Sequence, residues 1–335
     1  MLVPPYIWLL TIAAIVALLA YDFFFHVRKP HEPTLGEAAR WSAVYVGIAV
    51  TFGIGIWVFG GGEAGQEYFA GYLTEKALSI DNLFVFLIIM TSFAVPRMLQ
   101  QKVLLFGIAV ALAARTAFIF AGAALIAQFS WVFYIFGAIL FVTGAQVMLG
   151  KGDKSDEADN VLIRLARRFL KTTDHYDGDR MTTTTLGRRR FTPMLLVMVA
   201  IGGTDILFAL DSIPAIYGLT QDVYIVFTAT AFSLLGLRQL YFLVDGLLDR
   251  LVYLSYGLAA ILAFIGAKLV LHALHENALP FVNGGQPVPV VEISTGPSLG
   301  VIIGVLAVTV VASLVSPAGR ARSRPRAEQS VEVAD

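Results

Sequence analysis

Long apolar runs are the feature that most constrains how this chain can fold. A helix needs about 20 mostly apolar residues to cross the hydrocarbon core of a bilayer. Stretches that meet this requirement lie at about 4–25, 41–60, 68–93, 102–127, 130–150, 193–218, 222–245, 250–273 and 298–316. Only 14% of the residues are charged, whereas soluble domains carry about a quarter. The sequence therefore predicts an all-α polytopic membrane protein with about nine transmembrane helices.

The basic residues predict how these spans are oriented. Cytoplasmic loops of membrane proteins are enriched in Lys and Arg. If the N-terminus is outside, every loop on the inner side contains Lys or Arg, whereas residues 60–67 and 275–297 on the outer side contain neither. We therefore expect a transmembrane domain over residues 1–316 that includes a cytoplasmic loop at 151–192. Residues 317–335 are rich in Arg and read as a disordered cytoplasmic tail.

Three soluble or interfacial features leave their roles open. Residues 156–171 within the 151–192 loop form either an amphipathic helix on the anionic inner leaflet or a solvated linker. His272, His275 and Glu276 near the outer side form either a release site for a metal or ordinary interfacial side chains. Asp22, near the inner end of the first span, is either a gate residue or an interfacial charge.

An internal repeat divides six of the spans into two units. Residues 74–83 resemble residues 204–213, because each has an acid six residues before an Asp-Asn or Asp-Ser pair. Further along, the matched positions are Arg115 with Arg238 and Gly144 with Gly266. The units comprise spans 3–5 and spans 6–8. Because three is odd, they enter the membrane from opposite sides, which predicts an inverted repeat of the kind on which many secondary transporters are built.

The repeat places acidic residues at membrane depth. Each carboxylate at the bilayer centre costs about 2.5–3.5 kcal/mol on insertion scales, and the chain places Glu75, Asp81, Asp205 and Asp211 there. Within each pair the two acids are six residues apart, about 240° around a straight helix. They therefore cannot share one face of an intact helix.

Glycine and proline near the second pair predict a broken helix. Gly202 and Gly203 precede Asp205, and Pro214 follows Asp211. Proline removes a backbone hydrogen bond, and irregular backbone at membrane depth is tolerated where it lines a cavity. We expect the sixth span, and more weakly the third, to be discontinuous.

A pseudo-twofold axis would then gather one metal site. Its expected ligands are Glu75, Asp81, Asn82, Asp205, Asp211 and Ser212. Oxygen ligands suit Mg²⁺, Ca²⁺ or Mn²⁺, and the chain has no cysteine. Because four carboxylates exceed the charge of a divalent ion, either some are protonated or Arg115 and Arg238 compensate them. Alternatively, the carboxylates only pair with Arg115, Arg238 and Lys76 to hold helices together.

Three segments carry a resemblance to a known family. They are residues 72–86 (YLTEKALSIDNLFVF), 204–216 (TDILFALDSIPAI) and 236–242 (GLRQLYF). Over about residues 5–275 the chain resembles the TerC/Alx family of bacterial membrane proteins. The resemblance implies a fold akin to the lysine-exporter superfamily, a link to tellurium resistance, manganese efflux, and the six ligands above as the ion path. The family pattern usually has Glu where this chain has Gly202, which leaves one ligand and the coupling stoichiometry open.

Together these features predict a transporter of the bacterial plasma (inner) membrane. We expect it to export a divalent cation, Mn²⁺ first and Ca²⁺ second, coupled to protons, with the lipid bilayer as its surroundings. We expect no enzymatic activity, no permanently bound cofactor and no nucleic-acid partner. An intramembrane aspartyl protease is disfavoured, since Gly202 to Asp205 reads Gly-Gly-Thr-Asp rather than Gly-x-Gly-Asp. The alternative is a membrane hub that recruits stress-response partners through residues 151–192.

Overall fold

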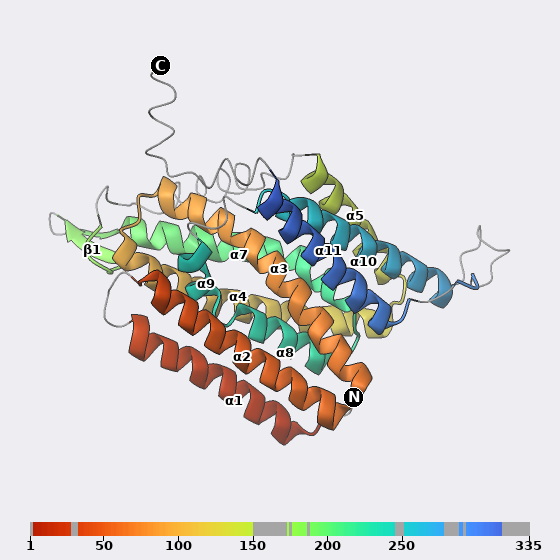
Figure 1. Cartoon of the computed structure of the whole chain (residues 1–335). Helices are drawn as coiled ribbons and strands as arrows, with labels where there is room; N and C mark the ends of the chain where they lie inside the picture. Colours follow the sequence, from red (N-terminus) through yellow and green to blue (C-terminus); the bar gives the residue numbers. More distant parts are fainter. Residues whose placement is uncertain are drawn as a thin grey trace, which may run out of the picture.

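The chain folds into a bundle of long helices with one small hairpin at one end (Figure 1). The computed structural model describes residues 3–27, 33–149, 173, 176–185, 188–244, 251–277, 288–290 and 293–316. The predicted amphipathic helix at 156–171 and the tail at 317–335 lie outside these residues. In the described part, 7 helices are long and apolar enough to cross a membrane. The all-α polytopic prediction is confirmed.

The helices follow the predicted spans closely. They are α1 (Pro5–Asp22), extended by a π-helical turn (Phe23–Val27), α2 (Leu35–Gly60), α3 (Gly62–Ser92), α4 (Arg97–Gln128), α5 (Val132–Met148), α7 (Pro193–Tyr217), α8 (Val223–Leu234), α9 (Leu237–Val244), α10 (Leu254–Glu276) and α11 (Thr295–Val315). The apolar set comprises α1, α2, α4, α7, α10, α11 and the α8 and α9 pair. The other two predicted spans correspond to α3, which carries charges in its middle, and α5, which has 17 residues. Nine crossings therefore remain a prediction.

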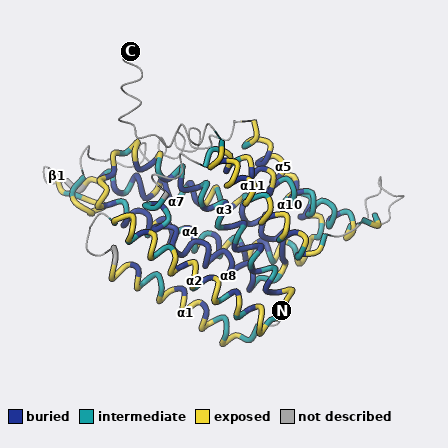
Figure 2. The backbone as a smooth tube through the Cα atoms, viewed as in Figure 1, coloured by how far each residue is buried: buried dark blue, intermediate teal, exposed yellow. Residues whose placement is uncertain are grey.

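Burial separates the helices at the centre from those at the periphery. Every residue of α8 from Tyr224 to Leu234 is buried, whereas α1 buries only Thr11, Ile15 and Asp22. Figure 2 shows the same contrast, with exposed backbone along α1 and α2 and buried backbone in α3, α4 and α8. Apolar side chains on a peripheral helix suit contact with lipid tails. The polar residues of the central helices are therefore shielded by other helices.

Helices α5 and α10 pack closely through two contacts that the predicted repeat relates to each other. A Cβ on Gly137 would lie 3.1 Å from the carbonyl oxygen of Gly266, and a Cβ on Gly144 would lie 3.2 Å from that of Ala259. The alignment that matches Gly144 with Gly266 also matches Gly137 with Ala259, so each contact is the symmetry mate of the other. Small residues let helix backbones approach this closely in membranes. The inverted repeat stays a prediction, which this pair of contacts supports.

The expected breaks in the sixth and third spans are wrong. Both α7 and α3 run as continuous helices past their acidic residues. Pro214 lies in the last turn of α7, and the helix continues past it to Tyr217. Gly202 packs against α4 instead of unwinding, since a Cβ there would lie 3.2 Å from Val110 Cγ1.

The interruption lies instead in the seventh span, between α8 and α9. Leu235 is extended and Gly236 has φ of 78°, a conformation that favours glycine. A Cβ on Gly236 would also lie 2.7 Å from Cβ of Tyr45 on α2. Glycine is therefore required here both by the backbone conformation and by the neighbouring helix.

A hairpin of strands β1 (Thr182–Thr185) and β2 (Arg188–Phe191) precedes α7, with Thr182 opposite Phe191. The described residues before it dock on the ends of α3 and α4. The Tyr176 hydroxyl donates to the carbonyl of Phe93 at 2.8 Å, and Lys102 Nζ donates to Asp179. The hydrogen bond from Lys102 holds the pKa of Asp179 below its usual value. These contacts fix one end of the 151–192 segment to the helix bundle.

Candidate functional site

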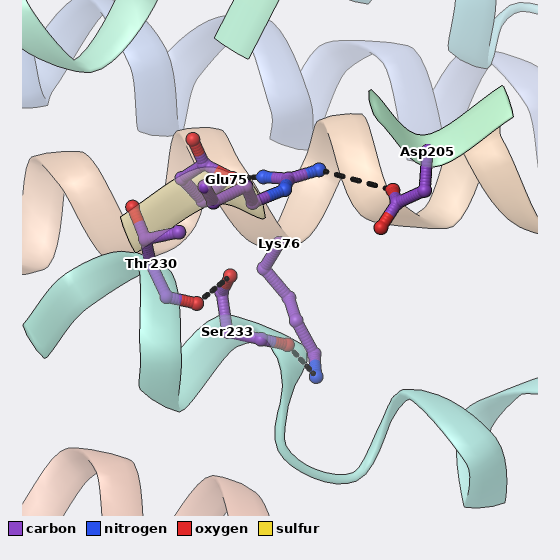
Figure 3. Close-up of polar contacts among 6 residues, drawn as sticks. Glu75, Lys76, Asp205, Thr230 and Ser233 are labelled. Carbon is purple, nitrogen blue, oxygen red and sulfur yellow. Dashed lines mark hydrogen bonds and ion pairs between the residues drawn. The ribbon is translucent and has the colours of Figure 1, made fainter. Parts of the chain in front are cut away.

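One buried cluster joins the first acid of each of the two matched sequence motifs. Arg115 on α4 donates through Nη1 to Glu75 on α3, and its Nη2 lies 3.6 Å from Asp205 Oδ1 on α7 (Figure 3). Glu75 is 0%, Arg115 1% and Asp205 3% exposed. Charges at this depth require compensation. One guanidinium between two ionised carboxylates leaves one excess negative charge.

This cluster retains unused hydrogen-bonding capacity. Among the described residues, Oε1 of Glu75, Nε of Arg115 and Oγ1 of both Thr74 and Thr230 are buried without a hydrogen-bond partner. An unsatisfied buried polar group costs about 1–3 kcal/mol. Such a concentration of unsatisfied groups in one place is unusual for a purely structural ion pair.

The second acids of the repeats line a different space. Asp81 on α3 and Asp211 on α7 both face a cavity of about 70 Å³ between α3, α5, α7 and α10. Its other polar lining residues are Asn82, Thr143 and Ser212. A cavity needs about 10–15 Å³ on this measure to hold one water. This cavity therefore has room for a small ion or for water.

Hydroxyl groups hold both of these carboxylates. Thr143 on α5 donates to Asp211 Oδ1 at 2.9 Å, and Ser255 on α10 donates to Asp81 Oδ1 at 3.2 Å. Ser212 is 2% exposed, and its Oγ lacks a hydrogen-bond partner within the described part of the chain. Thr143 and Ser255 were not predicted from the sequence. Neither α5 nor α10 has a local pattern that indicates which hydroxyl contacts an acid on another helix.

The six predicted ligands are therefore divided between two places. Glu75 and Asp205 meet at Arg115, whereas Asp81, Asn82, Asp211 and Ser212 line the 70 Å³ cavity. The division follows from the intact helices, since acids six residues apart lie about 240° apart around a straight helix. Over the described residues, no group of three or more His, Asp or Glu is placed to hold a metal. A cation in the cavity would need neutral oxygen ligands as well.

Arg238, the second predicted compensating arginine, lies in a third cluster. Its Nε donates to Asp22 Oδ2 at 3.0 Å and its Nη2 donates to Asp22 Oδ1 at 2.7 Å. Nη1 of Arg238 donates to Gln101 on α4, and Gln239 Nε2 donates to Asp22 at 2.8 Å. The turn at Gly236 directs Arg238 toward α1, so it compensates Asp22 rather than the repeat acids. Asp22, for which the sequence left a gate residue or an interfacial charge open, is a buried member of this ion pair.

A wider polar cavity lies where α3, α7 and α10 reach their outer ends in the predicted orientation. It has a volume of about 540 Å³, and its lining includes Glu63, Glu67, Lys268 and His272. Thr220 donates to Glu67 Oε2 at 2.7 Å, while Nε2 of His272 lies 3.0 Å from Gln221 Nε2. His272, which the sequence predicts as part of a metal release site or as an interfacial side chain, lines this polar cavity, here called the vestibule.

Comparison with known proteins agrees with this architecture. The profile of the integral membrane protein TerC family matches residues 60–321. The chain is 61% identical over 321 residues to an uncharacterized membrane protein, Rv2723, of Mycobacterium tuberculosis, covering 95% of this chain and 81% of the relative. It is 40% identical to the uncharacterized membrane protein STKORF319 of Myxococcus xanthus, with 93% and 92% covered.

A more distant relative has a more specific name. The putative membrane-bound redox modulator Alx of Escherichia coli is 37% identical, with 91% of this chain and 93% of the relative covered. No solved structure matches the chain. The family profile extends from the end of α2 to beyond α11 and includes both acidic motifs, and each of these relatives covers more than 90% of the chain. The chain therefore belongs to the TerC family of multi-pass integral membrane proteins.

Proposed function

We propose that this protein exports a divalent metal cation, Mn²⁺ first, across the bacterial plasma membrane in exchange for protons. The observation that carries the proposal is that Asp81 and Asp211, from the two matched motifs, line the same cavity. Two carboxylates balance the charge of one divalent ion. In the proposed orientation the N-terminus is outside and the C-terminus is cytoplasmic, so export runs toward the 540 Å³ vestibule.

The cavity chemistry supports a hard cation. Its polar lining consists of carboxylate, amide and hydroxyl groups, and oxygen atoms of these groups are preferred ligands of Mg²⁺, Ca²⁺ and Mn²⁺. The unpaired hydroxyl of Ser212 and the amide oxygen of Asn82 would complete the shell with water. Thr143 and Ser255 would orient the carboxylates, as partners of metal ligands commonly do. The choice of Mn²⁺ over Ca²⁺ rests on the family resemblance.

The cluster at Arg115 supplies a place for the coupling proton. Glu75 and Asp205 share one guanidinium, so a single proton would neutralise the group. In this proposal Arg115 occupies the position that a metal would need, and the cluster carries protons while the cavity carries the ion. This division distinguishes the proposal from the single six-ligand site that the sequence predicts.

The names of the relatives fit an indirect effect of metal transport. The chain has no cysteine, so it has no thiol with which to exchange electrons. In this proposal, metal export would change the redox balance of a cell without such chemistry, and the tellurium resistance that the family resemblance implies would follow in the same indirect way. The rival function is a membrane hub that recruits stress-response partners through residues 151–192. Deleting part of that loop separates the two, because a hub loses its function whereas a transporter keeps its flux.

The direct test is Mn²⁺ flux in proteoliposomes under an imposed pH gradient. The parental protein is expected to move Mn²⁺, and Asp81→Asn and Asp211→Asn are each expected to reduce the rate at least about tenfold. Asp179→Asn is the matched control, because Asp179 lies in the segment before α7 and pairs with Lys102. If both cavity variants move Mn²⁺ and Ca²⁺ at the parental rate, the proposed function is wrong.

A further inference from the structure

The interruption between α8 and α9 leaves backbone carbonyl groups inside the bundle without a partner in their own helix. The last carbonyls of a helix have no partner within the helix, and here the chain turns at Leu235 and Gly236 before α9 begins. Ser233 is 0% exposed and Leu235 is 4% exposed. Such carbonyls are normally satisfied by neighbouring donors, because water does not reach them.

The donor that meets them is a lysine. Lys76 on α3 extends to the break, and its Nζ donates to the carbonyl oxygens of Ser233 at 3.0 Å and Leu235 at 3.4 Å (Figure 3). Lys76 follows Glu75 directly, but Glu75 is paired with Arg115. Within the described residues, the partly buried Lys76 therefore binds uncharged carbonyls, although an opposite charge is the usual partner of a lysine inside a protein.

Carbonyls at the end of a helix are a suitable environment for a cation. The C-terminal end of a helix carries partial negative charge, and backbone carbonyls replace the hydration shell of alkali ions in channel filters. We propose that the carbonyls of Ser233 and Leu235 form a binding site for a small monovalent cation, which the ammonium group of Lys76 occupies as a tethered ligand. This site is separate from the divalent cation cavity and does not depend on the proposed transport function.

The location of the site gives the tethered cation a mechanical role. Lys76 connects the turn of α3 that bears Glu75 with the break that directs Arg238 toward Asp22. Displacement of the ammonium group would uncouple α3 from the start of α9. An alkali ion from solution would take its place only if the lysine side chain left enough room.

Two substitutions of Lys76 distinguish the loss of its charge from the loss of its side-chain volume. Lys76→Ala removes the ammonium group and leaves room for an ion, whereas Lys76→Met removes the charge but fills the same volume. The full-length protein in lipid nanodiscs is unfolded by heat in chlorides of sodium, potassium, ethylammonium and N-methylglucamine. We expect the midpoint of Lys76→Ala to rise by about 2–4 °C in at least one of the first three salts relative to N-methylglucamine. The parental protein, Lys76→Met and the surface control Lys102→Ala are expected to have the same midpoint in all four salts.

Other outcomes would overturn the assignment. If Lys76→Ala has the same midpoint in all four salts, or stays unfolded in all of them, the carbonyls accept no free cation. An equal rise in Lys76→Met or in the parental protein would place the salt effect elsewhere. Because the readout is folding, it is independent of whether the protein transports Mn²⁺.

Discussion

At the scale of single residues, Arg115 joins the first acid of each matched motif in one buried ion cluster. Its guanidinium binds Glu75 and Asp205 at a depth where water is excluded, and all three side chains are almost fully buried. Asp211 accepts a hydrogen bond from Thr143, and Asp81 accepts one from Ser255. The two pairs of acids match in sequence, but the first acid of each motif lies at Arg115 and the second lines the cavity.

Replacing Arg115 tests this view of the buried cluster. Arg115→Gln is expected to lower the stability of the protein by about 3–5 kcal/mol, because it leaves two buried carboxylates without a counter-ion. Thermal unfolding in nanodiscs measures the effect. The control is Arg180→Gln, which breaks an exposed ion pair with Asp177 and should change stability by no more than about 1 kcal/mol. Equal midpoints for the two variants would contradict the assignment.

The hydroxyl of Thr143 offers a milder perturbation of the cavity. Thr143→Val keeps the shape but removes the hydrogen bond to Asp211, which contributes about 1–1.5 kcal/mol. We expect the KM for Mn²⁺ in proteoliposomes to rise by about tenfold while the protein stays folded. Thr116→Val removes a hydroxyl that donates to the carbonyl of Leu112 within α4, and it should leave the KM unchanged. A normal KM in Thr143→Val would exclude Thr143 from positioning Asp211.

At the scale of elements, the break between α8 and α9 makes the two predicted repeat units differ. In the first repeat, α4 is continuous and brings Arg115 to the acids. In the second, the turn at Gly236 moves Arg238 away to Asp22 on α1. The first helix of the chain, which lies outside the predicted repeat, is thereby joined to the core by a buried ion pair.

Gly236 is the residue on which this arrangement depends. Gly236→Ala is expected to destabilise the protein by about 1–3 kcal/mol, because alanine is strained at φ of 78° and its Cβ would meet Tyr45. Gly300→Ala on α11 is the matched control, since a Cβ there meets nothing within 4 Å. Thermal unfolding distinguishes them: the control should be neutral or slightly stabilised. A neutral Gly236→Ala would show that the turn does not need glycine.

At the scale of the whole molecule, the sequence predicts the membrane fold and the positions of the acids along the helices. It does not predict correctly which acids lie together. Apolar run length determines where helices lie, so the helix ends agree with the predicted spans within about six residues, although the seventh span is divided into α8 and α9. Pro214 and Gly202 were misleading because their effect depends on position in the helix and on Val110 of a neighbouring helix. The true break at Gly236 and the Arg238 to Asp22 ion pair arise from contacts between distant segments. No local pattern contains that information.

The six-residue spacing of the acids nevertheless predicts their grouping correctly, once the helices are known to be intact. Since α3 and α7 are intact, acids about 240° apart must face different neighbours. That geometry alone separates Glu75 from Asp81 and Asp205 from Asp211. All four acids could face one site only if each helix were broken between its two acids. Because the helices are intact, the acids form two separate groups. The central claim is thus that the second acid of each repeat serves one cation.

A double-mutant cycle of Mn²⁺ binding tests that claim most directly. Equilibrium binding of Mn²⁺ is measured on the purified parental protein, Asp81→Asn, Asp211→Asn and the double variant. If both aspartates bind one ion, each single variant should weaken binding at least about tenfold, and the double variant should be weakened by much less than the product of the two effects. Unchanged affinity in the single variants, or effects that multiply as for independent sites, would contradict a shared cation site.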